Sequence, residues 1–144
     1  MDVAFAFLAD SAVVPPDRKL YVLGGGFTTL TMPTLPGRAT FAVVAGFRFT
    51  AADAKSVHAV EVRLVDAEGK LVLPPATLQF QAAAIPKEQE EITVSTVTYM
   101  SPMFGEPGRY RVEYSSSDRL LAGIGLTVAQ PPRPGEPALG PRPN

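Results

Sequence analysis

Three consecutive glycines, Gly24 to Gly26, stand out first, because glycine-rich loops can cradle a phosphate group. A phosphate loop also needs a lysine and a serine or threonine directly after the last glycine, at the start of a helix. Here Phe27, Thr28 and Thr29 follow, which favour a strand, and no lysine follows the run closely. We therefore interpret the glycines as a bend between two strands, where glycine accepts a positive φ.

Such a bend requires only one glycine, so the other two leave room for another backbone to approach closely. That backbone belongs either to the same sheet or to a partner. The sequence therefore makes Gly24, Gly25, Gly26 and Phe27 a candidate contact site.

His58 is the only histidine, and a Ser-His-Asp triad needs one. It stands at the beginning of an expected strand, and no serine has the Gly-x-Ser-x-Gly context of a nucleophile elbow. The sequence has no cysteine, which excludes a cysteine nucleophile, a zinc–thiolate site and a disulfide. We interpret His58 as a structural residue and expect no enzymatic activity.

The carboxylates form two groups that could act in catalysis or bind a metal. Asp66 and Glu68 precede Gly69, as in one loop of a calcium-binding sandwich, but no second loop supplies further oxygen ligands. Glu88, Glu90 and Glu91 lie together before a strand, whereas paired glycosidase acids come from facing rigid elements. We interpret the first group as a turn and the second as a solvated connection, and we expect no metal and no cofactor.

The segment YMSPMFG, residues 99–105, places three large apolar side chains in an expected loop, Met100, Met103 and Phe104. Exposed, they would form an adhesive patch; folded over one end of the domain, they would form a plug. We favour the plug, but these residues are also the best candidate for a partner contact, because methionine adapts to irregular surfaces.

Charge and hydropathy restrict the classes of partner. The 13 basic residues balance 14 acidic ones, and the cations do not cluster as nucleic-acid binding requires. The apolar N-terminal segment begins with Asp2 and is interrupted by Asp10, which argues against a signal peptide. No window approaches the roughly 18 apolar residues of a membrane span. Together with the absence of cysteine, this predicts a cytoplasmic protein that contacts neither nucleic acid nor membrane.

The elements that must position these residues are strands, because apolar residues recur with a period of two. Residues 57–66 and 70–73 predict one hairpin, residues 109–117 and 120–128 predict another, and residues 50–56 predict at most a one-turn helix. One face of the strand at 41–49 can only be core, and it consists of Phe41, Val43, Ala45, Phe47 and Phe49.

Short strands separated by proline-containing loops are typical of sandwiches. We therefore predict a single all-β domain over residues 1–129, an antiparallel β-sandwich of Ig-like or C2-like type with about seven to eight strands. Residues 130–144 are rich in proline and nearly free of residues that could be buried, which predicts a disordered tail.

The order of several motifs resembles an uncharacterised bacterial family of actinobacterial type, catalogued as a domain of unknown function. The matching positions are Ala9-Asp10, Lys19-Leu20, Gly24 to Phe27, His58, Leu64, Asp66 and Gly69. The resemblance covers about half of the chain, up to Lys70. It implies a small β-sandwich and supplies no activity and no site residues.

By elimination, we predict a non-enzymatic interaction or assembly module, which contacts a protein partner or a second copy of itself through a sheet edge or a loop end. The alternative is a sandwich that binds a sugar, lipid or nucleotide near the glycine run and the YMSPMFG segment. A hydrolase that uses His58 as its base is the third hypothesis.

Overall fold

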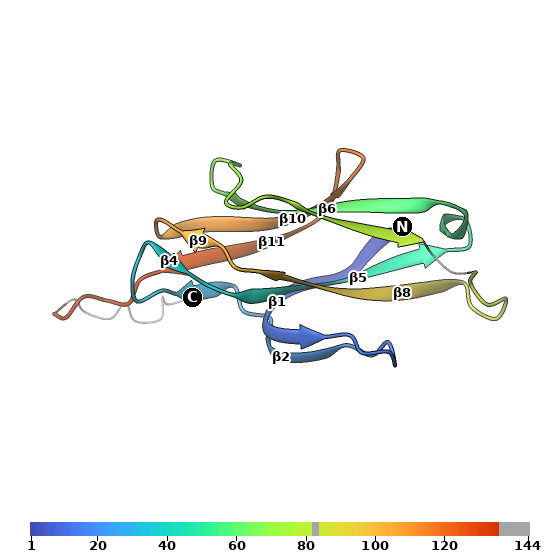
Figure 1. Cartoon of the computed structure of the whole chain (residues 1–144), viewed down its shortest axis with the longest axis horizontal. Helices are drawn as coiled ribbons and strands as arrows, with labels where there is room; N and C mark the ends of the chain where they lie inside the picture. The colour runs from blue at the N-terminus through green and yellow to red at the C-terminus, as the bar shows by residue number, and fades with distance from the viewer. Residues whose placement is uncertain (82–83, 136–144) are drawn as a thin grey trace, which may run out of the picture.

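A computed structural model of the chain describes residues 1–81 and 84–135 (Figure 1). Within these residues the only helix is a single 3-10 turn, η1 (Asp53–Lys55), and all other regular structure is strand. The prediction of an all-β fold is therefore confirmed. The turn lies inside residues 50–56, where the sequence predicts at most one turn of helix.

One sheet, sheet A, has four antiparallel strands in the order β2-β1-β5-β8. These strands are β1 (Asp2–Val13), β2 (Tyr21–Gly25), β5 (Phe41–Thr50) and β8 (Glu91–Met100). β5 lies between β1 and β8, and its residues from Phe41 to Phe47 are all buried. Burial on both faces explains why β5 reads as a nearly continuous apolar run.

The other large sheet, sheet B, has five strands in the order β3-β11-β10-β6-β7. They are β3 (Thr29–Thr31), β6 (Val57–Asp66), β7 (Ala76–Gln81), β10 (Gly108–Ser116) and β11 (Arg119–Ala129). A third sheet pairs β4 (Gly37–Arg38) with β9 (Met103–Phe104).

Two details differ from the prediction. The described residues form eleven strands rather than seven to eight, because β3, β4 and β9 are only two or three residues long. Segments this short cannot show a periodicity in the sequence. The strands are also not all antiparallel, since β3 runs parallel to β11. In the chain, β3 follows β2 of sheet A and the glycine run, so no hairpin joins β3 to β11.

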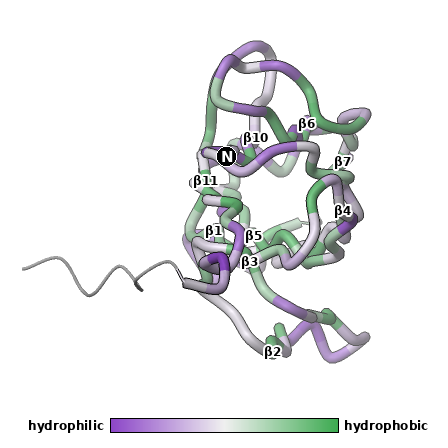
Figure 2. The backbone as a smooth tube through the Cα atoms, turned by 90° about the vertical axis from the view of Figure 1, so that its left-hand side faces the viewer, coloured by the Kyte–Doolittle hydropathy of each residue, from purple (hydrophilic) through white to green (hydrophobic). Residues whose placement is uncertain are grey.

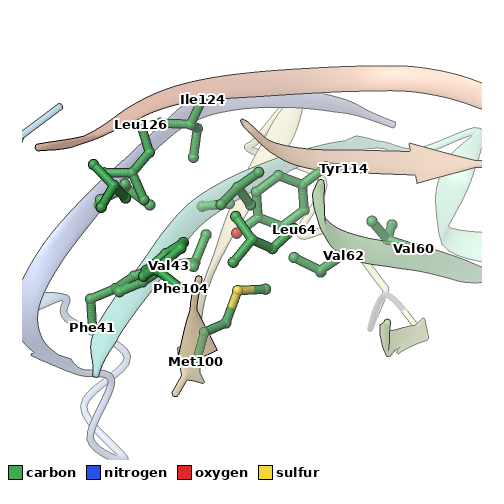
Figure 3. Close-up of a cluster of buried hydrophobic side chains, with 14 of the residues drawn as sticks. Phe41, Val43, Val60, Val62, Leu64, Met100, Phe104, Tyr114, Ile124 and Leu126 are labelled. Atoms are coloured by element: carbon green, nitrogen blue, oxygen red, sulfur yellow. The ribbon is translucent and has the colours of Figure 1, made fainter. Parts of the chain in front are cut away.

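The main core lies between the facing sides of sheets A and B (Figure 3). The Phe47 ring of sheet A lies 4.9 Å from the ring of Phe80 and 5.6 Å from that of Tyr114, both in sheet B. The predicted core face of β5 is confirmed, because all five of its side chains are buried in this cluster.

β1 bends after Ala9, and its second half pairs with β2 alone. Ala9 is the last residue of β1 that pairs with β5, whereas Ser11 to Val13 pair only with β2. We call this hairpin, residues 10–25, the arm. Figure 2 shows β2 on the opposite side of sheet A from β6 and β10.

The arm covers the outer face of sheet A. Ala42 and Val44 alternate along β5 with core residues and therefore point away from sheet B. Both side chains are nevertheless fully buried, and they belong to a second cluster that includes Ala12 and Val22 of the arm. The molecule therefore has a small second core between sheet A and the arm.

Both predicted hairpins are confirmed. β10 pairs with β11 throughout, and the chain returns after β6 through a Val65–Leu71 bridge and a hydrogen bond from Val72 N–H to Leu64 O. Of the predicted disordered tail, residues 130–135 are exposed and lack regular structure, whereas residues 136–144 lie outside the described residues.

Candidate protein-interaction surface

The glycine run lies where the arm turns away from the rest of sheet A. Gly24 has a φ of +61°, and a Cβ at this position would overlap the carboxylate of Asp10 on the facing strand. Asp10 directly follows Ala9, the last residue of β1 that pairs with β5. The two strands of the arm therefore change direction together, at Asp10 and Gly24.

The neighbours of the other two glycines also belong to this chain. A Cβ on Gly25 would lie 2.8 Å from Val22 Cγ1 and 3.3 Å from the Phe7 ring. The N–H of Gly26 donates a 2.7 Å hydrogen bond to Leu8 O. The close approach predicted for this run is thus made by its own sheet.

Tyr99 of β8 fastens the arm to sheet A. Its hydroxyl accepts a 3.0 Å hydrogen bond from Ala12 N–H, donates a 2.9 Å bond to Ala12 O and lies 3.1 Å from Ser11 Oγ. The bonds from Ser11 and from the Ala12 N–H hold the pKa of the Tyr99 phenol below its usual value. The Tyr99 side chain thereby forms hydrogen bonds with the backbone of β1 at Ala12, beyond Ala9, where the pairing of β1 with β5 ends.

The side of the arm that faces solvent is apolar. Leu23 is 73% exposed, Val13 54% and Tyr21 49%. Val13 and Tyr21 are directly opposite each other, and Leu23 lies two residues further along β2 on the same side. We call these three residues the arm patch.

The middle of the outer face of sheet B has the opposite character, and the exposed apolar residues of this face, Val57 and Leu120, lie at the starts of β6 and β11. Arg63 lies 3.7 Å from Glu61 and 3.4 Å from Glu113, and Arg111 lies 3.5 Å from Glu113. Partly exposed ion pairs of this kind add little stability, but they keep a surface hydrated. The arm patch is therefore the more suitable of these two surfaces for burial against a partner.

The remaining candidate contact residues separate in the structure. Met100 and Phe104 are buried in the main core (Figure 3). Phe27 packs against this core with its ring 6.4 Å from that of Phe41. These side chains therefore act as a plug. Met103 is 50% exposed and is the only one of the three residues from the YMSPMFG segment whose side chain a partner could reach.

His58 and Ser116 are engaged with the backbone. A ring nitrogen of His58, Nε2, lies 2.9 Å from Asp53 O, and its ring lies 5.6 Å from that of Phe49. Ser116 and Ser117 line a hollow of about 310 Å³ together with His58, but the Ser116 hydroxyl donates to Ala59 O. The described hydrogen bonds therefore do not form a nucleophile–base pair here.

The carboxylate Asp66 closes a turn. Its Oδ1 accepts hydrogen bonds of 2.9 Å from both Glu68 N–H and Lys70 N–H. In the part of the chain that the structure describes, no three His, Cys, Asp or Glu residues gather as metal ligands. The interpretation of Asp66 and Glu68 as turn residues agrees with this geometry.

A second hollow, of about 470 Å³, lies beside the exposed Met103. Lys70, Leu71, Arg109 and Tyr110 also line it. The glycine run lines neither this hollow nor the one at His58, so the two segments that the ligand-binding hypothesis combines do not meet there.

The arm patch and Tyr99 are functional candidates that sequence reasoning missed. Val13 and Leu23 are flanked by apolar Ala12 and Val22, and two-sided apolar runs are typical of strands buried on both faces. The available signal was Asp10, a charged residue inside such a run, which marks the position where β1 leaves β5.

Comparison with known proteins extends the resemblance seen in the sequence. A family model described as "Family of unknown function (DUF6941)" matches residues 4–129, so the match ends with β11. None of the curated proteins matches this chain. In the described ranges, no helix has the length and apolar character needed to cross a membrane.

Proposed function

The chain belongs to DUF6941, a family of unknown function, and we propose that it is a non-enzymatic protein-interaction module. In this proposal the arm patch binds a partner protein. The observation that supports it is the contrast between the two sides of the arm: the inner side is buried on sheet A, while Val13, Tyr21 and Leu23 face solvent.

The composition and support of the arm patch suit protein recognition. Tyrosine is enriched at the centre of protein interfaces, where it supplies a large contact area with little loss of conformational entropy. The strands beneath the patch are held by Tyr99 and by the second core, so little backbone ordering is needed on binding.

The test compares two variants that introduce the same charge. Leu23→Glu places a carboxylate in the arm patch, and Gln79→Glu places one at an exposed position of β7 in sheet B. Each full-length variant and the wild type are immobilised, and proteins retained from a lysate of the source organism are quantified by mass spectrometry.

We expect a set of proteins that the wild type and Gln79→Glu retain equally and that Leu23→Glu retains roughly tenfold less, equivalent to about 1.4 kcal/mol. Equal melting temperatures of the two variants verify that both are folded. Retention of the same proteins by all three forms would overturn the assignment to the arm patch.

A small-ligand site is the second candidate, and the hollow beside Met103 is the observation that favours it. Its lining combines the cations Lys70 and Arg109 with the carboxylates Asp66, Glu68 and Glu106, a set of donors and acceptors that suits a polar, uncharged molecule such as a sugar. A rise in melting temperature with a simple sugar, abolished in Arg109→Ala, would support this role. No shift with any such compound would remove it.

Two finer assignments also belong to the proposal. The two facing sheets support a sandwich of Ig-like or C2-like type. The absence of cysteine supports a reducing, cytoplasmic location.

A further inference from the structure

The four edge strands of sheets A and B are protected to different degrees. Exposed edges invite pairing with another strand, and natural sheets prevent it by shortness, proline, charge or irregular backbone. β3 has three residues, β2 has five and includes Gly24 and Gly25, and β7 has six and follows Pro74-Pro75. Each of these three edges thus carries at least one form of protection.

β8 lacks these protections. It has ten residues and pairs with β5 over its whole length without a register shift. Figure 1 shows β8 beside β5. From Ile92 to Met100 it contains no charged residue, no proline and no glycine. On the side away from β5, its backbone groups have no strand partner among the described residues. A long, regular, uncharged edge of this kind is suited to strand addition.

We propose that β8 pairs with β8 of a second copy of this chain. The two strands run antiparallel about a two-fold axis at Thr96 and join two copies of sheet A into one continuous sheet. This register pairs the whole uncharged stretch with itself: Ile92 lies opposite Met100, Val94 opposite Thr98 and Ser95 opposite Val97.

The chemistry of β8 favours a second copy as the occupant. Only apolar and uncharged hydroxyl-bearing side chains meet across the axis, so no like charges face each other. Glu91 lies outside the paired stretch, 3.8 Å from Arg48 of its own sheet. A charged peptide would find no counter-charge between Ile92 and Met100, whereas a second β8 needs none.

A two-fold axis perpendicular to sheet A leaves the outer faces of both copies on the same side. The two arms therefore lie on that side, and a dimer presents two arm patches to a partner. The β8 pairing uses a different surface from the arm patch and does not depend on the proposed function.

The first test measures mass against concentration by sedimentation. We expect the full chain, of 15.3 kDa, to form a dimer of twice that mass. Ser95→Lys places a charge on the edge near the axis and is expected to weaken the dimer at least tenfold, because two lysines then approach each other across the axis. Gln79→Lys, the same charge on edge strand β7, is expected to leave the dimer unchanged.

A second measurement keeps the test decisive if Ser95→Lys does not fold. The sequence contains no cysteine, so a single introduced thiol reports only on its own position. Thr96→Cys on the axis is expected to form an intermolecular disulfide on mild oxidation, whereas Gln79→Cys is not.

A monomer at concentrations up to about 1 mM would overturn the proposal. So would a dimer that Leu23→Glu dissociates and Ser95→Lys does not, since self-association would then belong to the arm patch. A third outcome separates the two proposals. If the dimer forms through β8 but Leu23→Glu still retains every protein that the wild type captures, the assignment of partner binding to the arm patch fails, whereas the β8 dimer is supported.

Discussion

At the scale of single residues, the Tyr114 hydroxyl is buried without a hydrogen-bond partner in the described structure (Figure 3). Burial also raises the pKa of this phenol, because a phenolate in the core would lose its hydration. Tyr114→Phe removes an unpaired polar group and keeps the ring. We therefore expect this variant to raise the free energy of unfolding by about 1 kcal/mol, measured by urea denaturation.

Tyr110→Phe is the matched control, because the Tyr110 hydroxyl donates a 2.7 Å hydrogen bond to Glu106 O. Removing that bond is expected to lower the free energy of unfolding by about 1 kcal/mol. The two substitutions delete the same atom and should change stability in opposite directions. A loss of stability in Tyr114→Phe as large as that in Tyr110→Phe would show that the Tyr114 hydroxyl does have a partner.

At the scale of elements, the two glycines with positive φ in the run have different surroundings. A Cβ at Gly24 would overlap Asp10, whereas a Cβ at Gly26, where φ is +87°, has no atom within 4 Å. Gly26→Ala should therefore cost only the strain of the backbone conformation, about 1 kcal/mol. Gly24→Ala should cost about 0.5–1 kcal/mol more, because the exposed Asp10 side chain must also turn away from the new methyl group.

A double variant isolates the contribution of the overlap. Asp10→Ala combined with Gly24→Ala should recover part of the lost stability, and combined with Gly26→Ala it should recover none. Chemical denaturation of the six proteins, the wild type and single variants included, gives the coupling energy. Equal losses for Gly24→Ala and Gly26→Ala would show that Asp10 does not restrict the bend.

The sequence predicted best those elements in which large apolar side chains recur at every second residue. β6 and β10 alternate apolar with charged side chains, and β5 has an uninterrupted core face, so their boundaries and buried residues follow from periodicity. The arm could not be predicted in this way. Its apolar run continues on both sides of Asp10, and its position on the outer face of sheet A involves contacts with Tyr99, 87 residues away from Ala12 along the chain.

The candidate site was predicted in part for the same reason. The glycine run was correctly interpreted as a bend, but what packs against it, Asp10 and Phe7, follows only from the pairing of β1 with β2. Met100 and Phe104 could be named from the sequence, whereas their burial depends on how residues 99–105 fold over the core.

At the scale of the whole molecule, the arm and the two-sheet body are separate units that the second core and Tyr99 hold together. The arm lies outside the main core, and its backbone does not pair with β5, since the pairing of β1 with β5 ends at Ala9. The Tyr99 hydroxyl supplies the hydrogen bonds between β8 and the second half of β1 that the structure describes. Loss of this hydroxyl should therefore loosen the arm without loosening the body.

Tyr99→Phe tests this coupling by amide hydrogen exchange. We expect hydrogen exchange at the amides of Ala12 and β2 to accelerate by roughly fivefold to tenfold. Exchange requires local opening of the arm, and without the Tyr99 hydrogen bonds this opening costs less free energy. Exchange in β5 and β10 should stay unchanged.

Tyr21→Phe serves as the control, since the described hydrogen bond of its hydroxyl goes to Asp17, within the arm itself. If both variants, or neither, accelerate exchange at Ala12, then Tyr99 does not fasten the arm, and the rigid presentation of the arm patch must come from the second core alone.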